Sequence, residues 1–537
     1  MKTLFTRTRV AIAAAALVPF LGLAACTDLS VDPYSAVTPE NFYQNDVQVI
    51  AALSPVYAQL RGTLWAYHNV SQVSSDENIV PTRGGDWFDN GDWLSLHQHS
   101  WTPTLGYLND AWNTSYTGVA RANNVLRDIS ELDNVPNEDV LVAELRGLRA
   151  FYYYTLLDMF GNIPLIGDEP NEYEVDQDNP PPTVPRPEVF AFVVSELEDI
   201  RDTLPVAGAG NGGRLSQGAV DAMLASLYLN AEVFGGTVST SGLSRGTARW
   251  ADAEAAATRI IDSGVYSLNQ GADAWFAQFS PDNQDNPEQI FVVQHLAEDG
   301  YGVNFVNRWG HYSSFAGGGW NGFSTIAETY NAFDDDDPRK GIFLQGQAYN
   351  MDDCDPRVTD EASSDYCTSE DAINDRSGSP LIFSVDFPGG VDPRDGGNAT
   401  EGNGVRVYKF PLDPERVGQY NGNDYPYFRL GEMHLIRAEA RLRQGDNAGA
   451  LADINVIRNR IGVAPLASVT LDDILNERLF ELTYEARRRQ DLIRFDRFIS
   501  GTWSFKGGAS QPYRVLFAVP QLQIDASDGA VVQNPGY

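Results

Sequence analysis

The stretch FRLGEMHLIRAEARLRQGDNAGALADINVIRNRIG, residues 428–462, decides the fold. Apolar side chains recur at three-to-four spacing on both sides of a short turn at residues 445–447, which is the pattern of two amphipathic helices. Gly445 stands where the first helix should end. Because so short a turn returns the chain alongside itself, the stretch predicts an antiparallel helical hairpin, and the small side chains of Ala438 and Ala440 suit a close contact between helices.

The same periodicity returns in other parts of the chain. We expect helices within residues 138–164, 189–204, 215–234, 249–264 and 471–495. In the last of these, Ile474, Leu475, Leu479 and Leu482 share one side of a predicted helix whose opposite side is charged. Helical hairpins repeated at about this length resemble tetratricopeptide repeats, although no strict period is present. The chain is therefore predicted to be mostly α-helical.

Two long regions, roughly residues 61–112 and 270–425, lack periodicity and are dense in glycine, asparagine, aspartate and aromatic residues. Loops this long in a compact domain are usually functional or disordered. Their tryptophan content favours a functional role, because disordered segments contain few aromatic residues.

The N-terminus has the order of a secretory signal. Three basic residues within the first nine positions precede the apolar stretch VAIAAAALVPFLGLAA (10–25), and Cys26 follows it. The junction LAAC (23–26) resembles a lipobox, in which the cysteine is acylated and becomes the new N-terminus; an ordinary signal peptide followed by a chance cysteine is the alternative. Acyl chains contribute about 0.8 kcal/mol per buried methylene, so Cys26 would anchor the protein to a membrane.

We therefore expect a signal peptide at residues 1–25, a lipidated flexible tether at 26–39 and a single domain at 40–537. That domain would have a repeat-rich part at about 40–270, a loop-rich ligand lobe at about 270–425 and C-terminal helices at about 425–537. No other stretch approaches about twenty uncharged apolar residues, so the mature protein is expected to be anchored to the membrane without crossing it.

Cysteine and charge restrict the compartment and the partners. An exported chain meets an oxidising compartment, so Cys354 and Cys367 are expected to form a disulfide; metal ligation is the less favoured alternative, because no histidine lies nearby in the sequence. The formal net charge is −35. Such an acidic surface repels phosphate backbones, which argues against nucleic acid as a partner.

Four C-terminal blocks in sequence order resemble the signature series of the SusD/RagB family of nutrient-binding outer-membrane lipoproteins. The blocks are DYPYFRLGEMHLIRAEA (424–440), LADINVIRNRIG (451–462), NERLFELTYEARRRQDLIRF (476–495) and LFAVPQLQIDASDGAVVQNPGY (516–537). Upstream, residues 143–165, 214–232, 250–268 and 333–339 also resemble elements of the family. One departure is that the family often has a tryptophan before the aspartate-leucine pair of this block, whereas this chain has Arg489-Gln490-Asp491-Leu492 there.

The resemblance implies a right-handed superhelix of four tetratricopeptide-like hairpins that carries an irregular, loop-rich lobe. It also implies a lipoprotein at the cell surface, anchored to the outer membrane. Such a protein captures an oligosaccharide or a peptide and acts as a hinged lid for a SusC-type TonB-dependent barrel. No covalent chemistry, cofactor or metal is implied.

Five of the ten tryptophans fall within residues 65–112. Aromatic rings beside carboxylates, amides and Arg83 suit a sugar, because its C–H faces stack on rings while its hydroxyls form hydrogen bonds. Trp87, Trp93 and Trp101 are therefore candidate ligand contacts, with burial in the core as the alternative. Trp112 lies in a predicted helix and is expected to face inward.

Two further groups of candidate ligand contacts complete the prediction. The adjacent acids Asp76 and Glu77 are similar to an acidic ligand-contacting element of the family; a solvated turn is the alternative. A second aromatic run on a glycine-rich loop contains Trp309, Tyr312 and Trp320, which would form the opposing wall of the site.

Other chemistries are less favoured. His97 and His99 stand at strand spacing without a third ligand in view, and the run at residues 334–337 lacks the spacing of an EF-hand loop, so structural calcium is not indicated. A glycosidase needs two positioned acids, but no catalytic motif accompanies the acids here. The alternative functions are a tetratricopeptide-like adaptor and, less favoured, a surface glycoside hydrolase.

Overall fold

The computed structural model describes residues 42–133, 135–167, 178–206 and 213–537. The predicted signal peptide, Cys26 and the predicted tether lie outside the described residues. The helices are α2 (Asp46–Val73), α3 (Asp92–His97), α4 (Gly106–Ser130), α5 (Glu138–Met159), α6 (Arg186–Ile200), α7 (Gln217–Leu229), α8 (Ala231–Phe234), α9 (Trp250–Asp262), α10 (Ala272–Ala277), α11 (Phe305–Trp309), α12 (Ala327–Ala332), α13 (Leu430–Gln444), α14 (Asn447–Arg460), α15 (Leu471–Leu482), α16 (Arg488–Arg494) and α17 (Gln521–Ala526).

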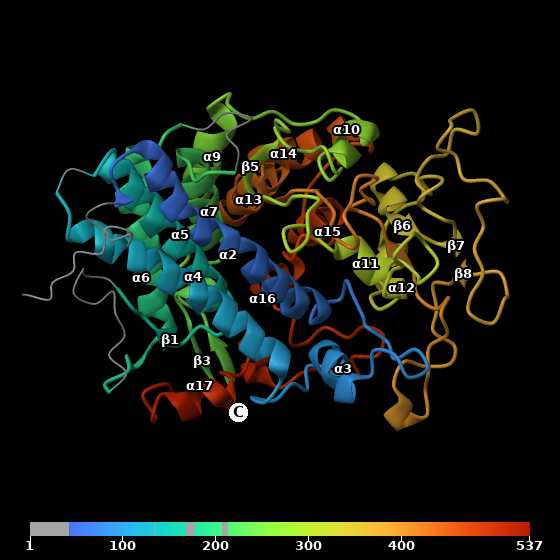
Figure 1. Ribbon diagram of the computed structural model, residues 1–537, viewed down its shortest axis with the longest axis horizontal. Coiled ribbons are helices and arrows are strands. Elements are labelled where there is room, and N and C mark those ends of the chain that lie inside the picture. The colour runs from blue at the N-terminus through green and yellow to red at the C-terminus, as the bar shows by residue number, and fades with distance from the viewer. Residues whose placement is uncertain (1–41, 134, 168–177, 207–212) are drawn as a thin grey trace, which may run out of the picture.

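The long helices pack in pairs along the chain: α2 with α4, α5 with α6, α7 with α9, and α13 with α14. Consecutive pairs also touch, because α4 packs on α5, α6 on α7 and α9 on α13. In Figure 1 this helical scaffold fills one side of the molecule, and the lobe with α11, α12 and β6 to β8 fills the other. The mostly helical fold that the sequence predicts is thereby confirmed.

Local sequence explains where these helices begin and end. The Asn45 side chain accepts a hydrogen bond from the Gln48 backbone N–H at 3.1 Å and so caps α2. In the hairpin that decides the fold, Gly445 ends α13 with a φ of 89°, a left-handed conformation that favours glycine. Asp446 then caps α14 by accepting from the Gly449 N–H at 2.9 Å. The predicted hairpin is confirmed.

The strands are short and pair in twos. The longest pair is antiparallel, between β5 (Gln289–Val293) and β10 (Tyr425–Arg429), and β10 leads directly into α13. The remaining antiparallel pairs are β1 (Ile163–Pro164) with β2 (Thr183–Val184), β3 (Thr237–Ser239) with β4 (Gly242–Ser244), β6 (Phe343–Leu344) with β9 (Arg406–Val407), and β7 (Gly346–Gln347) with β8 (Ile382–Phe383). The β5–β10 pair thus ties the loop-rich segment after residue 270 to the scaffold.

The predicted single helix at residues 471–495 is wrong. The structure has α15 and α16 instead, separated by a break in which Tyr484 and Ala486 adopt positive φ values of 63° and 56°. From Glu477 onward the charged residues of this segment are buried and not on an outer face, whereas Asp472 at its start is exposed. Glu481 is fully buried and accepts hydrogen bonds from Arg339, Arg429 and Arg460, so pairing explains how these charges are accommodated inside the protein.

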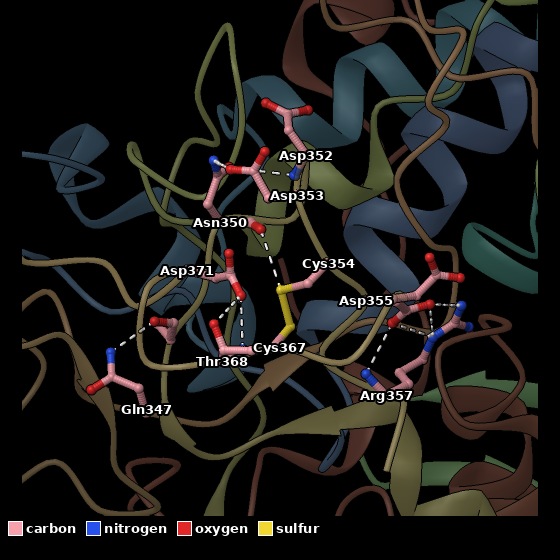
Figure 2. The surroundings of a disulfide bond; sticks show 12 residues. Gln347, Asn350, Asp352, Asp353, Cys354, Asp355, Arg357, Cys367, Thr368 and Asp371 are labelled. Atoms are coloured by element: carbon pink, nitrogen blue, oxygen red, sulfur yellow. Dashed lines mark hydrogen bonds and ion pairs between the residues drawn. A yellow bond between two sulfur atoms is a disulfide. The ribbon is translucent and has the colours of Figure 1, made fainter. Parts of the chain in front are cut away.

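A disulfide joins Cys354 to Cys367 and closes a surface excursion of the lobe (Figure 2), with the two Cα atoms 5.1 Å apart. Beside it, the Arg357 Nη2 lies 2.6 Å from an Asp355 carboxylate oxygen. The backbone N–H of Met351, three residues before Cys354, donates to the Ser314 carbonyl at 2.7 Å. The excursion therefore holds the 311–320 loop from outside.

No helix in the part of the chain that the structure describes combines the length and apolarity needed to cross a membrane. Trp112 lies in α4 and is 4% exposed, as predicted for an inward-facing ring.

Candidate functional site

Three segments far apart in sequence meet in the lobe. Ile79 and Ser324 form an isolated antiparallel bridge, and Arg83 bridges Ala399 in parallel. Backbone hydrogen bonds of 2.8 to 2.9 Å hold these contacts, because the Ile79 N–H donates to the Ser324 carbonyl and the Ala399 N–H donates to the Thr82 carbonyl. The segments around residues 79–93, 311–325 and 376–406 are thus fixed side by side without a continuous sheet.

A cluster of charged and aromatic side chains joins these segments near the surface. The Tyr312 hydroxyl donates to Asp86 Oδ2 at 2.7 Å, and the Arg376 guanidinium lies over the Tyr312 ring, 4.5 Å from its centroid. Arg376 also donates to Asp86 at 3.2 Å and to Glu401, whose second oxygen lies 2.9 Å from His311 Nε2. We call Asp86, Tyr312, Arg376 and Glu401 the rim cluster.

The electrostatics of the rim cluster follow from these contacts. Burial, reinforced by the hydrogen bond to Asp86, raises the pKa of Tyr312 to about 12, so the phenol stays a donor at neutral pH. Burial alone would raise the pKa of Glu401, but hydrogen bonds from Arg376 and His311 lower it. The cluster therefore presents two carboxylates, a guanidinium and a phenol hydroxyl, which can donate to and accept from hydroxyl groups.

Three half-buried tryptophans lie next to the rim cluster, and we call Trp65, Trp87 and Trp320 the aromatic floor. Trp87 Nε1 donates to the Trp320 carbonyl at 2.7 Å, and the rings of Trp65 and Trp320 meet edge-on with centroids 6.1 Å apart. A Cβ atom on Gly322 would come within 2.4 Å of the Trp87 ring, so this position requires glycine. Partly exposed rings beside polar groups suit the stacking of sugar rings.

For Trp93 the structure supports the alternative, burial in the core. Trp93 is 4% exposed and its Nε1 donates to Asp89 at 2.8 Å, while Trp101 is 1% exposed and donates to the Tyr537 hydroxyl at 2.7 Å. Trp309, at 4% exposure, also belongs to the hydrophobic core. In this conformation these three rings stabilise the protein by burial and offer no face to a ligand.

The predicted acidic pair also faces inward. Both oxygens of the half-buried Asp76 accept from Arg488, each at 2.8 Å. Glu77 is fully buried, accepts from the Gln72 amide and from the Tyr484 N–H at 3.2 Å, and burial raises its pKa to about 7. In this conformation Glu77 is closed to a ligand and Asp76 is engaged by Arg488, so the structure gives no support to a ligand contact at this pair.

Arg83 lies beneath the site rather than in it. It is 1% exposed, and its guanidinium donates to the Ser324 hydroxyl and the Asn403 carbonyl, each at 2.8 Å, and to the Thr400 carbonyl. Arg406 donates to the same Ser324 and Asn403 oxygens at 2.8 and 2.9 Å. The two arginines brace the loops that carry the rim cluster, which explains why Arg83 is buried.

Sequence reasoning missed four residues of the site: Asp86, His311, Arg376 and Glu401. Arg376 meets Asp86 across a separation of 290 residues, so nothing local in the sequence connects them. The one available signal was the DWFDN context of Asp86, which stands directly before Trp87.

The two predicted alternative metal residues are engaged in internal hydrogen bonds. His97 places Nδ1 2.9 Å from the Asn78 carbonyl and Nε2 2.8 Å from the Ser504 carbonyl, and His99 Nε2 lies 2.7 Å from the Ser74 carbonyl. Burial lowers the pKa of both imidazoles.

Two of the four aspartates in the acidic run at residues 334–337 form ion pairs. Asp335 pairs with Lys340 at 2.7 Å and Asp337 pairs with Arg339 at 2.8 Å. Over the described ranges, no group of three or more histidine, cysteine, aspartate or glutamate side chains is arranged to hold a metal ion.

Comparisons with known proteins converge on one family. Residues 287–537 match the model of the SusD family, and residues 30–229 match a model described as starch-binding associating with outer membrane. The starch-binding protein SusD of Bacteroides thetaiotaomicron is 25% identical over 500 residues, which cover 87% of this chain and 85% of that protein.

Solved structures share the fold. Surface glycan-binding protein A from Bacteroides thetaiotaomicron, in complex with laminarihexaose, superposes with a TM-score of 0.69 at 20% identity over 91% of this chain and 99% of its own. A laminarin-binding SusD-like protein gives a TM-score of 0.68 at 21% identity over 92% of this chain and 100% of its own. These similarities establish the fold of the chain, whereas its ligand depends on the side chains of the site.

Proposed function

We propose, on the premise that this chain belongs to the SusD family, that it captures a glycan with the rim cluster and the aromatic floor. The contact between Tyr312 and Asp86 carries the proposal, because it joins an aromatic ring to a polar rim beside Trp87 and Trp320. A pyranose presents C–H faces and hydroxyl edges, which require this combination of rings and charged hydrogen-bonding groups. Relatives named for starch, laminarin and glycan binding support it.

Substitution of the rings tests the proposal. Tyr312→Ala and Trp320→Ala should each weaken binding to a recognised polysaccharide about tenfold or more, measured by affinity electrophoresis over a glycan panel and then by calorimetry. Trp250→Ala is the matched control, because Trp250 is a half-buried tryptophan of α9 in the scaffold. The proposal would be overturned if Tyr312→Ala and Trp320→Ala bound the polysaccharide as tightly as Trp250→Ala and wild type. It would also be overturned if the wild type bound no glycan.

We further propose that the mature protein is lipid-anchored through Cys26 at the cell surface, in the outer membrane, and closes as a lid over a SusC-type TonB-dependent barrel. The family model that names association with the outer membrane supports this location, and the junction LAAC supports the anchor. Detergent extraction and affinity purification should recover a large barrel protein. Cys26→Ala should release a folded, glycan-competent protein, whereas tight membrane retention of that variant without a barrel would contradict the anchor.

We expect a glycan-binding lid to catalyse no reaction. Incubation of a bound polysaccharide with the protein should therefore release no shorter product, and product release would favour the glycoside hydrolase instead.

A further inference from the structure

Positive charge without a carboxylate partner gathers around the aromatic floor, in a protein whose formal net charge is −35. Most arginines in the described ranges pair with a carboxylate within 4.0 Å. The arginines there that form no such ion pair are Arg61, Arg83, Arg121, Arg186, Arg308, Arg406 and Arg514. Four of them, Arg61, Arg83, Arg308 and Arg406, lie beside or beneath the proposed glycan site.

Arg308 lies directly under the floor. Its guanidinium carbon is 3.5 Å from the centroid of Trp65, and its Nη1 donates to His68 Nδ1 at 2.9 Å. His68 Nε2 donates to the Tyr484 carbonyl at 3.2 Å, and burial keeps the imidazole neutral by lowering its pKa. His68 is therefore a neutral acceptor for Arg308 and supplies no negative charge. Arg308 Nε and Nη2 are buried without a hydrogen-bond partner among the described atoms.

Arg83 and Arg406 place two like charges under the rim cluster. They share the Ser324 hydroxyl and the Asn403 carbonyl as acceptors, and burial lowers the pKa of both. The carboxylates nearest the surface, Asp86 and Glu401, already pair with Arg376. Around the rim cluster, Arg83, Arg376 and Arg406 therefore accompany the carboxylates of Asp86 and Glu401, and the buried Arg308 adds a guanidinium without a carboxylate partner beneath the floor.

Arg61 brings this charge to the surface. It lies one helical turn before Trp65 on α2, so the two side chains share a face. Its guanidinium lies 5.2 Å from the centroid of the half-exposed Tyr301 ring, and its only hydrogen-bond acceptor among the described residues is the Gln294 carbonyl at 3.1 Å. Burial lowers the pKa of Arg61, and no carboxylate reverses the effect.

A groove of about 420 Å³ opens at this position, lined by Arg61 and Tyr301 together with Ser54, Tyr57, Gln294 and Leu296. Phe305 stacks on Trp65 at 6.0 Å, so the segment from Tyr301 to Phe305 follows α2 from the groove to the floor. A ligand chain lying on the floor can therefore reach Arg61 with a neighbouring residue.

We propose that the glycan taken by this site is acidic, and that Arg61 binds a carboxylate or sulfate ester of the glycan in the groove beside the aromatic floor. This inference rests on the proposed function. A guanidinium binds either anion through paired N–H groups. The buried Arg308, which contacts Trp65, adds positive charge beneath the floor, whereas the acidic surface of the rest of the protein repels such a polymer.

Matched polymers test the inference on the wild-type mature protein. One pair is polygalacturonate with its methyl ester, which isolates a carboxylate; the other is laminarin sulfate with laminarin, which isolates a sulfate ester. In at least one pair the charged member should bind about tenfold or more tightly than the uncharged one. That preference should shrink as sodium chloride rises to about 0.5 M, because salt screens it.

Two variants assign the effect to one residue. Arg61→Gln should reduce the preference about tenfold. Arg514→Gln should keep it, since Arg514 matches Arg61 in donating to one backbone carbonyl, that of Trp101 at 2.9 Å, and in lying 5.0 Å from a ring centroid. An unchanged preference in Arg61→Gln would overturn the assignment.

The outcomes separate the two proposals. Binding restricted to uncharged polymers such as laminarin, starch or xylan would overturn the acidic ligand and leave glycan capture standing. Binding to no polymer of either kind would overturn glycan capture and the acidic ligand together.

Discussion

Asp76 and Arg488 meet across 412 residues of sequence, with Arg488 Nε and Nη2 each 2.8 Å from a different oxygen of the Asp76 carboxylate. This two-pronged pair ties the end of α2 to the start of α16. Arg488 is 8% exposed at its side chain and Asp76 19%, so the pair is largely shielded from water. It closes the contact between the N-terminal and C-terminal parts of the described chain.

Asp76→Ala should lower stability. Because the substitution leaves the Arg488 guanidinium buried without its carboxylate, we expect the free energy of unfolding to fall by about 3 kcal/mol, measured by urea denaturation. Asp472→Ala is the control, since Asp472 and Arg497 form an exposed pair at 70% and 55% exposure; its effect should stay below about 1 kcal/mol. Weaker glycan binding at unchanged stability would instead restore Asp76 as a ligand contact.

The scaffold could be predicted because its information is local. Residues 428–462 contain their own periodicity, their own stop at Gly445 and their own cap at Asp446, and they form α13 and α14. The same reasoning gave a wrong prediction for residues 471–495, which form two helices and not one. There the charged side chains pair with residues distant in sequence, as Glu481 pairs with Arg339. A charged side of a predicted helix therefore need not face the solvent.

The site was less accessible to sequence because ring exposure depends on distant partners. Trp101 is covered by contacts that include Tyr537, 436 residues away, whereas Trp87 remains half-buried beside Trp320. All these tryptophans stand in similar glycine- and polar-rich contexts. Composition therefore did not distinguish the rings of the floor from those of the core, and it placed Trp65 in an irregular region although Trp65 lies in α2.

Glu481→Gln should destabilise the protein strongly. The substitution removes the charge that Arg339, Arg429 and Arg460 share inside the protein. We expect a loss of about 3 to 5 kcal/mol in the free energy of unfolding, because three buried guanidinium groups lose a common counter-charge. Asp202→Asn, at a side chain 89% exposed beside Arg201, is the control and should change stability by less than about 0.5 kcal/mol.

The pH dependence of Glu481 has a definite sign. Although burial opposes it, the three arginines hold the pKa of Glu481 well below its usual value. The stability that Glu481 contributes is therefore complete above the unfolded pKa of about 4.5 and is lost as the pH falls further. Wild type should lose more stability than Glu481→Gln between pH 6 and acid; parallel curves would contradict a shared buried carboxylate.

Replacing both Cys354 and Cys367 with serine should loosen the disulfide-closed excursion. The cysteines are 13 residues apart, and closing a loop of this size contributes about 3 kcal/mol in the chain-entropy model. We expect faster proteolysis within residues 355–366 of the variant, and the same pattern in wild type after reduction. Equal cleavage of the variant and the oxidised wild type would show that the excursion is held without the disulfide.

Glu77 should make the protein less stable as the pH rises toward neutrality. Burial raises the pKa of Glu77 to about 7, against 4.5 in the unfolded chain, although hydrogen bonds from Gln72 and Tyr484 favour the ionised form. Well below pH 4.5 the carboxyl is protonated in both the folded and the unfolded state, so it does not change the free energy of unfolding. Between pH 4.5 and about 7 the carboxyl ionises in the unfolded chain but stays protonated in the folded protein. The free energy of unfolding therefore falls by roughly 3 kcal/mol over this range and levels off above it.

Glu77→Gln removes this titration while preserving the shape of the side chain. Its amide oxygen can still accept from Gln72 and from the Tyr484 N–H, and Glu77 Oε1 has no hydrogen-bond partner among the described atoms. The variant should equal wild type near pH 4.5 and exceed its free energy of unfolding by up to about 3 kcal/mol at pH 8. Asp424→Asn supplies the comparison, because burial raises the pKa of Asp424 only to about 6, so its gain should be complete at lower pH. If Glu77→Gln were instead less stable than wild type at pH 8, the ionised carboxylate would be a stabilising partner inside the protein, and the assignment of a raised pKa to Glu77 would be wrong.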